Sequence, residues 1–78
     1  MGGYQIMKEF RLREGEDFIR LGQLLKAASL VGSGVEAKYA VEEGKALVNG
    51  EVCTMRGKKI HDGDVVSFGG EEIRVISG

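Results

Sequence analysis

Residues 33–52 read SGVEAKYAVEEGKALVNGEV, and along this stretch the hydrophobic period changes from that of a helix to that of a strand. Ser33 followed by Glu36 is a capping-box pattern, in which a hydroxyl and a carboxylate each bond a free backbone N–H of the first turn. The apolar face that follows is made of small residues, which let a partner helix approach closely: Ala37, Ala40 and Val41. We therefore predict a helix that begins at Ser33 and is stopped by Gly44.

After Gly44 the apolar residues alternate, which is the period of a strand. The segments ALV and EVC flank Asn49-Gly50, a pair that readily takes the positive φ angles of a type I′ turn, so a hairpin is predicted here. HDGD at 61–64 is interpreted as a turn whose aspartates bond their own backbone. DVVSF and EEIRVIS, joined by Gly69-Gly70, predict a second hairpin.

Upstream, MKEFRL at 7–12 predicts a short strand, which EGED at 14–17 breaks. From Phe18 the pattern becomes helical, with one apolar face made of Leu21, Leu24, Leu25 and Ala28. Two consecutive helices thus precede a run of short strands. Because these elements are segregated along the chain, we predict an α+β fold with two helices packed on a small, mostly antiparallel sheet.

The length and composition are those of one folded domain. The chain has 78 residues, so we expect a single domain over 1–78, with its core in 18–77 and residues 1–5 flexible. Cys53 is the only cysteine, which rules out an internal disulfide. No apolar run approaches the roughly 18 residues of a membrane span. The N-terminal residues also lack the apolar core of a signal peptide. We therefore expect a cytoplasmic protein with no membrane partner.

Candidate catalytic and metal sites are few. Cys53 and His61 are the only residues of their types, and a strand cysteine is more often a small core residue than a nucleophile. Residues 62–64, Asp-Gly-Asp, lack the further oxygen ligands of a calcium loop. Residues 32–34, Gly-Ser-Gly, precede a helix, but neither a preceding strand nor a Walker lysine accompanies them. We expect no enzyme activity, metal, cofactor or small-molecule substrate.

Positive charge is concentrated in one part of an acidic chain. The formal net charge is −1, yet between residues 45 and 59 four cations stand against the single anion Glu51. These cations are Lys45, Arg56, Lys58 and Lys59. The acids cluster elsewhere, at Glu14, Glu16 and Asp17, at Glu42 and Glu43, at Asp62 and Asp64, and at Glu71 and Glu72. We interpret the 56–59 run as an anion-binding edge, with a glycine that lets the backbone approach a partner.

The order of several short motifs carries more information than any one of them. The chain has RLGQLL at 20–25, SGVEA at 33–37, ALVNGEV at 46–52 and DGDVV at 62–66. From Arg20 to Phe68 this resembles the S4 RNA-binding domain, a family named after a ribosomal small-subunit protein. The family pattern runs Arg-Leu-Asp-x-x-Leu, Ser-Arg-x-x-Ala, an aliphatic residue, Gly, Val-Asn-Gly and a later Pro-Gly-Asp. The chain looks most like the small stand-alone bacterial members.

The resemblance implies an S4-like αL fold and non-catalytic binding of structured RNA, such as ribosomal RNA, by a monomer. The implied RNA-binding residues lie on the two-helix unit and the hairpin region after it: Arg20, Lys26, Lys38, Lys45, Arg56, Lys58 and Lys59. Three positions depart from the pattern: Gly22 replaces aspartate, Asp62 replaces proline, and Gly34 replaces an arginine that commonly meets phosphate. We hypothesise that phosphate contacts have moved to the 56–59 segment.

The other charged and aromatic groups complete this interpretation. The acidic clusters are expected to lie away from RNA, and Phe10, Phe18 and Phe68 are expected in the core. Tyr39 is interpreted equally well as a base-stacking ring or as a cover for the core edge. The basic face would then be compact and non-aromatic, which suits structured RNA better than single strands.

Two other functions fit parts of the sequence. The basic segment would also suit a protein-interaction adaptor with an acidic partner. A ubiquitin-like sulfur-carrier protein shares VNGE and a DGD turn near its C-terminus, but it needs a flexible terminal Gly-Gly. This chain ends VISG, with a single glycine directly after a predicted strand.

Overall fold

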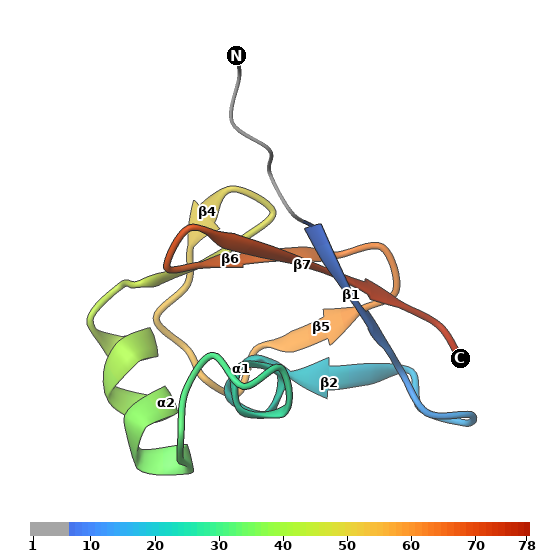
Figure 1. Ribbon diagram of the computed structural model, residues 1–78, viewed down its shortest axis with the longest axis horizontal. Helices are drawn as coiled ribbons and strands as arrows, with labels where there is room; N and C mark the ends of the chain where they lie inside the picture. Colours follow the sequence, from blue (N-terminus) through green and yellow to red (C-terminus); the bar gives the residue numbers. More distant parts are fainter. Residues whose placement is uncertain (1–6) are drawn as a thin grey trace.

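The computed structural model describes residues 7–78, so residues 1–5, expected to be flexible, lie outside the described residues. Two helices follow two strands and precede five more, as Figure 1 shows. In chain order the elements are β1 (Met7–Arg11), β2 (Phe18–Arg20), α1 (Leu21–Ala27), α2 (Gly34–Glu42), β3 (Ala46–Val48), β4 (Glu51–Val52), β5 (Lys59–His61), β6 (Val65–Phe68) and β7 (Glu71–Ile76). The predicted α+β class is confirmed.

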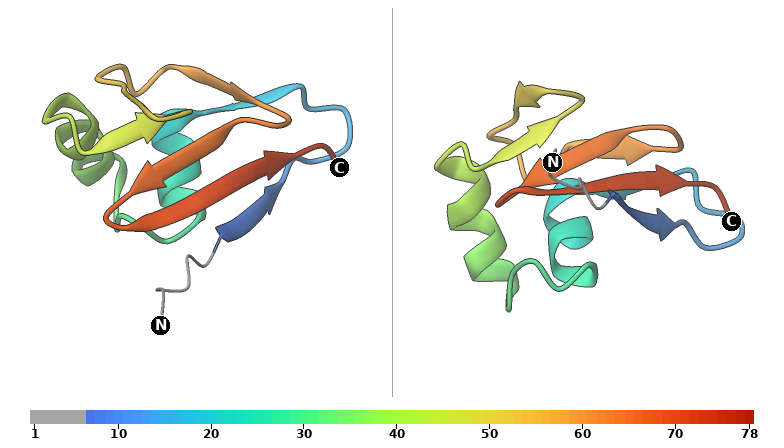
Figure 2. Two further views of the ribbon diagram at one scale, coloured as in Figure 1. Left: turned by 90° about the horizontal axis from the view of Figure 1, so that it is seen from above. Right: turned by 45° about the horizontal axis from the view of Figure 1, so that its top comes forward.

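The strands form two sheets. Five of them lie in the order β1-β7-β6-β3-β4, in which β1 and β7 are parallel and all other neighbours antiparallel. The remaining two, β2 and β5, form a separate antiparallel ribbon. The helices and this ribbon lie on the same side of the five-stranded sheet (Figures 1 and 2).

Both predicted hairpins are confirmed. Val48 pairs with Glu51 across Asn49 and Gly50, whose φ angles are 52° and 85°. In the second hairpin, the glycines between β6 and β7 have φ angles of 59° and 85°. Positive φ at both central positions is what a type I′ turn requires, and its twist matches that of the flanking strands. The turns therefore fix which side chains of β3, β6 and β7 face inward.

The core lies between the five-stranded sheet and the layer made by the helices and the ribbon. Its fully buried members from the helical layer are Leu21, Leu24, Leu25, Val41 and Ile60, and those from the sheet are Ala46, Val66, Ile73 and Val75. Leu12, which directly follows β1, is also only 2% exposed. The core therefore extends upstream of the expected range 18–77, because β1 joins the sheet as a parallel edge strand.

The start of the first helix was predicted wrongly. Phe18–Arg20 is a strand, and α1 begins at Leu21. Ile19 faces the core opposite Ile60, so the period of this segment is two and its partner is far away in the sequence. The helical pattern from Leu21 onward was correct, but β2 is specified by a long-range pairing that the local sequence does not reveal.

The predicted second helix is confirmed, with one change at its start. The Ser33 hydroxyl accepts the Glu36 N–H at 3.2 Å, as a capping box requires, but the Glu36 carboxylate accepts the N–H of Gly32 rather than that of Ser33. At the other end, Gly44 has a φ of 79° and donates to Val41, while Lys45 donates to Ala40. This is a Schellman ending, which satisfies the last carbonyls of α2.

Candidate functional site

The loop of residues 53–58 closes over the start of α1. The Gly22 N–H donates to the carbonyl of Arg56, and the Leu21 N–H donates to that of Lys58, both at 2.9 Å. These bonds satisfy two N–H groups that the first turn of a helix leaves free. A Cβ atom at Gly22 would lie 3.4 Å from the Arg56 Cβ, in van der Waals contact, so the loop packs closely against α1 here. Backbone carbonyls thus supply the cap where the S4 pattern has an aspartate side chain.

A shallow hollow of about 260 Å³ opens between α1, the start of α2 and this loop; we call it the interhelical hollow. Its charged lining residues are Arg20, Lys26 and Arg56, and Gly34 and Gly57 complete its floor and rim. Within residues 7–78 none of these three cations forms an ion pair with a carboxylate. The structure therefore brings together three of the predicted site residues from two distant parts of the sequence and leaves their charge uncompensated.

Gly34 lies in this same hollow, as the first residue of α2. A Cβ atom there would meet nothing within 4 Å, so the space that an arginine would fill is open. Arg56 lines the hollow from the opposite element. The hypothesis that the 56–59 segment replaces the missing arginine is therefore geometrically reasonable for Arg56.

The ribbon presents a second group of cations on its outer face. Phe18 pairs with His61 and Arg20 with Lys59, so these four side chains share the face opposite Ile19 and Ile60. The Lys59 ammonium lies 4.9 Å from the centre of the Phe18 ring, and the Arg20 guanidinium lies 5.8 Å from it. Both distances are those of cation–π contacts. The expectation that Phe18 belongs to the core is thus wrong, whereas Phe10 and Phe68 do pack against it.

A third group of residues lines the groove between the β3–β4 hairpin and β5. This groove is lined by Lys58 and Lys59 together with Cys53, Met55 and His61. Cys53 is half-buried, packs against the core and donates weakly to the Met55 carbonyl at 3.6 Å, while the His61 Nδ1 lies 3.8 Å from Asp64. Neither side chain forms a polar contact with the other in the part of the chain that the structure describes.

Lys38 and Lys45 stand apart from these hollows. Both side chains are exposed, but neither lines the interhelical hollow or the groove beside β5. Lys45 is engaged with Glu43, with 3.2 Å between Nζ and the carboxylate. Of the seven residues proposed from sequence, these two are the ones that the fold does not gather with the others.

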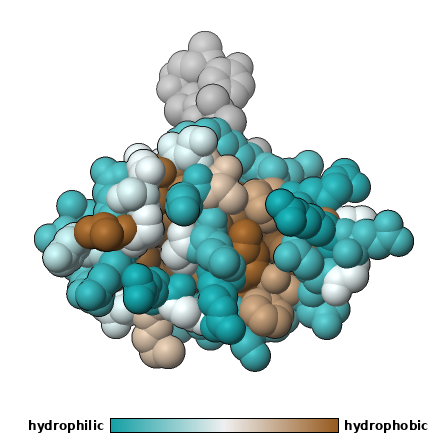
Figure 3. All heavy atoms as spheres, turned by 90° about the horizontal axis from the view of Figure 1, so that it is seen from below, coloured by the Kyte–Doolittle hydropathy of each residue, from teal (hydrophilic) through white to brown (hydrophobic). Residues whose placement is uncertain are grey.

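The sequence interpretation missed two arginines. Arg11 and Arg13 line a further hollow of about 460 Å³, beside β1, together with Phe10, Glu16, Phe18 and Lys26; we call it the β1 hollow. The run RLR at 11–13 was visible, but its position next to α1 depends on the parallel pairing of β1 with β7. Figure 3 views the helical side of the molecule, where hydrophilic side chains cover most of the surface and apolar surface is exposed between them near the centre. Glu16 lines the β1 hollow together with its cations, so the acids do not all lie away from the positive charge.

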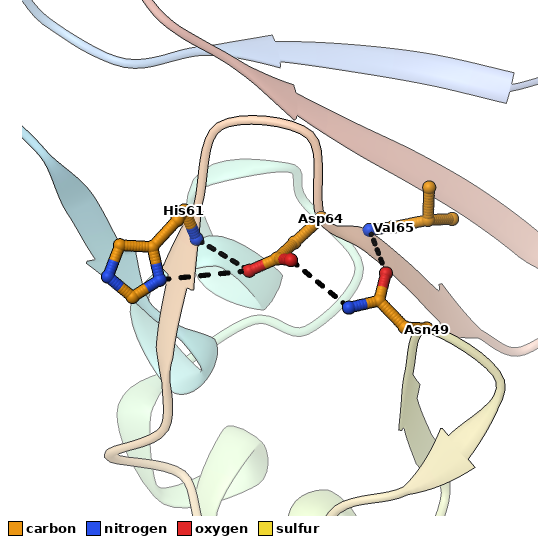
Figure 4. Close-up of polar contacts among 4 residues, drawn as sticks. All are labelled: Asn49, His61, Asp64 and Val65. Carbon is orange, nitrogen blue, oxygen red and sulfur yellow. Dashed lines mark hydrogen bonds and ion pairs between the residues drawn. The ribbon is translucent and has the colours of Figure 1, made fainter.

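A network of polar contacts lies elsewhere, between two turns (Figure 4). The Asn49 amide donates to Asp64 at 3.1 Å, and its oxygen accepts the Val65 N–H at 2.9 Å. Asp64 also accepts the His61 N–H at 2.8 Å. The VNG and DGD motifs are thus bound to each other; we call Asn49, His61 and Asp64 the turn cluster. The predicted DGD turn is confirmed, and Asp64 bonds the backbone of this turn as expected, whereas Asp62 accepts the distant Ser77 N–H instead.

The ionisation of Asp64 reflects this network. Partial burial raises the pKa of Asp64, but the hydrogen bonds from His61 and Asn49 and the positive charges of His61 and Lys58 lower it. The lowering effects prevail, so the pKa lies below its ordinary value of 3.8. The carboxylate is therefore held in its charged form to bond two backbone or amide donors, which is a structural role.

Within residues 7–78, no group of three His, Cys, Asp or Glu side chains is arranged to hold a metal ion. In the same part of the chain, neither helix has the length and apolar composition needed to cross a membrane.

Comparison with known proteins identifies the class. The sequence model of the S4 domain family matches residues 10–76, and the chain therefore belongs to the S4 domain family. The solution structure of YbcJ from E. coli, described as revealing an αL motif involved in RNA-binding, matches with a TM-score of 0.68 and 34% identity. That match covers 97% of this chain and 95% of YbcJ, which confirms the predicted αL fold.

Two curated proteins are similar to this chain in sequence. The "Probable ribosome maturation protein RlbA" of Bacillus subtilis (strain 168) is 44% identical over 54 residues, covering 69% of this chain and 76% of that protein. The "Putative RNA-binding protein YbcJ" of Escherichia coli (strain K12) is 39% identical over 59 residues, covering 76% of this chain and 84% of that protein. The resemblance inferred from the motifs is thus confirmed.

Proposed function

We propose that this protein is a non-catalytic, cytoplasmic RNA-binding module that acts as a monomer on structured RNA, with ribosomal RNA or ribosomal particles as its partner. The observation that carries this proposal is the interhelical hollow, where Arg20, Lys26 and Arg56 converge without carboxylate partners in the described part of the chain. Lys58 and Lys59 extend this charge along the loop and β5. Lys38 and Lys45 contribute more weakly, from the periphery.

The physical chemistry of RNA backbones supports this assignment. Each phosphate neutralised by a cation releases a condensed counterion, which favours binding regardless of sequence. Cations already paired with carboxylates would have to give up that pairing first, and within residues 7–78 the five central cations have no such pairing. Two of them belong to β2 and β5, where the backbone is held by ladder pairing. Less freedom is therefore lost on binding than in a disordered basic tail.

The names of the relatives agree with this proposal. One is named for ribosome maturation and another for RNA binding, and the YbcJ structure is described through an RNA-binding αL motif. A sulfur-carrier function gains no support from these names.

The test measures binding to ribosomal RNA fragments across a salt series. The triple variant Arg56→Glu, Lys58→Glu, Lys59→Glu is compared with wild type, and Lys45→Glu, whose lysine is already ion-paired, is the peripheral control. The slope of log affinity against log salt should fall by about 0.7–0.9 for each phosphate that the variant no longer neutralises. A folded triple variant with unchanged affinity would refute the assigned surface. Binding of an acidic protein partner, together with no RNA binding at modest salt, would favour the adaptor function instead.

A further inference from the structure

We propose that the β1 hollow is a second site on the RNA surface, which holds one unpaired nucleotide of a bulge or loop. The base of this nucleotide would lie against Phe10 and Phe18. The flanking phosphates would contact Arg11, Arg13 and Lys26. This inference rests on the proposed RNA-binding function and adds to it a ligand of defined chemistry. Except for Lys26, its residues lie upstream of the motifs that carry the S4 resemblance.

The aromatic part of the hollow is available to a ligand. Phe10 and Phe18 both line it, and both are only partly buried. Phe10 packs partly against the core, and Phe18 stands on the ribbon, where Lys59, Arg20 and His61 lie near its ring, so a stacked base would take the place of one of these neighbours. Unstacked bases bind on aromatic side chains, and sequence-tolerant stacking of this kind is a main source of affinity for single-stranded nucleotides. Two rings beside basic groups thus offer both parts of a nucleotide a partner.

The charge around the hollow favours a ligand with a phosphate. Arg11, Arg13 and Lys26 stand against the single acid Glu16, and none of the three cations is ion-paired within residues 7–78. The hollow's volume of about 460 Å³ falls in the usual range for sites that bind small molecules of nucleotide size. The hollow is therefore large enough for one nucleotide and has the charge to bind it.

The two hollows adjoin each other along α1. Gln23 and Lys26, one helical turn apart on the exposed side of α1, line both of them. An RNA backbone that contacts Arg20 and Arg56 on one side of α1 can pass these two residues and reach Arg11 and Arg13 on the other. This arrangement favours a nucleotide within an RNA chain over a free nucleotide, because a free nucleotide would contact the cations of only one hollow.

Glu16 gives the site a preference among bases. One of its carboxylate oxygens accepts the Arg13 N–H at 3.0 Å, and the carboxylate has acceptor capacity beyond this bond. An acceptor on the wall favours a base edge that carries donors, which guanine provides as adjacent N1–H and amino groups. Uracil is disfavoured, because two carbonyl oxygens flank its single donor. The Glu16→Gln variant keeps the bond to Arg13 but reduces this preference.

The experiment compares two RNA hairpins, one fully paired and one with a single bulged guanosine, as probes for the wild-type protein and its variants. Phe18→Leu keeps an apolar side chain and removes the ring. Tyr39→Leu is the matched control: Tyr39 is 60% exposed on α2, so it does not cover the core edge, and it lines neither hollow, so any base stacked on it would not depend on the β1 hollow. We expect wild type to bind the bulged hairpin roughly tenfold more tightly than the paired one. Phe18→Leu should abolish this preference and Tyr39→Leu should retain it.

The outcomes separate this inference from the function on which it rests. If the triple Glu variant of the 56–59 segment loses affinity for both hairpins while Phe18→Leu keeps the bulge preference, the nucleotide site is wrong and the RNA-binding function stands. If wild type binds neither hairpin at modest salt, both proposals fail. Arg13→Gln is a second variant that leaves the aromatic rings in place, and unchanged bulge preference in it would also overturn the site.

A nuclear magnetic resonance titration distinguishes the source of the ligand. Guanosine monophosphate should shift the ring signals of Phe10 and Phe18 only at millimolar concentration, whereas the bulged hairpin should shift them at far lower concentration. Inorganic phosphate alone should leave the ring signals in place. Tight binding of the free nucleotide without any effect of the hairpin would overturn the proposal, because the occupant would then be a small molecule.

Discussion

The turn cluster and the interhelical hollow use polar side chains in opposite ways. In the turn cluster, Asn49 and Asp64 bond each other and the backbone of neighbouring strands. In the hollow, Arg20 and Arg56 have no carboxylate partner within the described residues, and the contacts that hold the loop there are made by backbone carbonyls. One region has its polar side chains bonded within the fold, and the other leaves its cations without carboxylate partners among the described residues.

This difference teaches how the motifs of the family are to be interpreted. The VNG and DGD motifs come from separate turns, yet their side chains meet, so their presence together reports a shared structural contact (Figure 4). Around the 56–59 segment, the described residues show one side-chain hydrogen bond, a weak one from Arg20 to the Gly57 carbonyl at 3.5 Å, and the stronger bonds there are made by the backbone. The stability of the fold and the affinity for RNA are therefore expected to depend on different residues. Mutations should be able to change one without the other.

The largest expected effect is on RNA affinity. The triple variant Arg56→Glu, Lys58→Glu, Lys59→Glu should bind ribosomal RNA fragments on the order of 100-fold more weakly at low salt, because it replaces attraction to phosphates by repulsion. Its free energy of unfolding should change by less than about 1.5 kcal/mol, since these side chains are exposed and the Lys59 contact with the Phe18 ring is the main one lost. Fluorescence anisotropy and urea unfolding measure the two quantities. If the free energies of unfolding and of RNA binding fell by similar amounts, the distinction between the turn cluster and the interhelical hollow would be wrong.

The turn cluster should show the reverse behaviour. Asp64→Ala removes the acceptor for His61 and Asn49, and should lower the free energy of unfolding by about 1–3 kcal/mol. Asn49→Gly suits the positive φ of the turn while deleting the amide, and the two changes together should cost less than their sum. Urea unfolding of both single variants and the double variant gives the coupling energy. RNA affinity of folded Asp64→Ala should match wild type, and strictly additive losses would show that the two side chains act independently.

A smaller gain is expected from restoring the arginine of the family pattern. Gly34→Arg places a cation in open space beside Arg56 and should tighten RNA binding roughly fivefold, with a salt slope steeper by about 0.7–0.9. Gly34→Ala is the matched control, because it makes the same backbone change without the charge. If the alanine variant improves affinity equally, the gain comes from the stability of α2 and not from a phosphate contact.

The smallest expected effect is a pH dependence of stability. Because the pKa of Asp64 in the folded protein lies below 3.8, its ionised form stabilises the fold at pH values above about 4. This contribution is lost as the pH falls through the lowered folded-state pKa. Urea midpoints measured from about pH 6 to about pH 2.5 should therefore fall less steeply for Asp64→Asn than for wild type. Parallel curves would show that Asp64 does not couple protonation to folding.

Much of this molecule follows from local sequence signals. Asn49-Gly50 and Gly69-Gly70 specify type I′ turns, and Ser33 and Gly44 specify the ends of α2, because each depends on a few neighbouring residues. The same locality explains the errors. Phe18 looked helical and core-forming, since its strand partner His61 lies far along the chain. The bond from Gly32 to Glu36 also differs by one residue from the capping-box expectation.

The candidate site, too, could be predicted from the sequence only in part. The charge of the 56–59 segment was visible as a run of cations, and the family resemblance added Arg20 and Lys26. Their convergence in one hollow was not visible, because it depends on backbone bonds from α1 to the loop. Nor did the sequence indicate that Lys45 is engaged with Glu43, or that Arg11 and Arg13 lie beside α1.

By itself, the sequence determined the helix and turn boundaries that neighbouring residues encode, the α+β order of elements and membership of the S4 family. The tertiary structure alone decided which cations share a surface, which acids lie among them and that Phe18 is left outside the core. The physical reason is that hydrogen bonds within turns and caps span only a few residues. The position of a charged side chain on the surface instead depends on strand pairings, such as those of β1 with β7 and β2 with β5, that join distant parts of the chain.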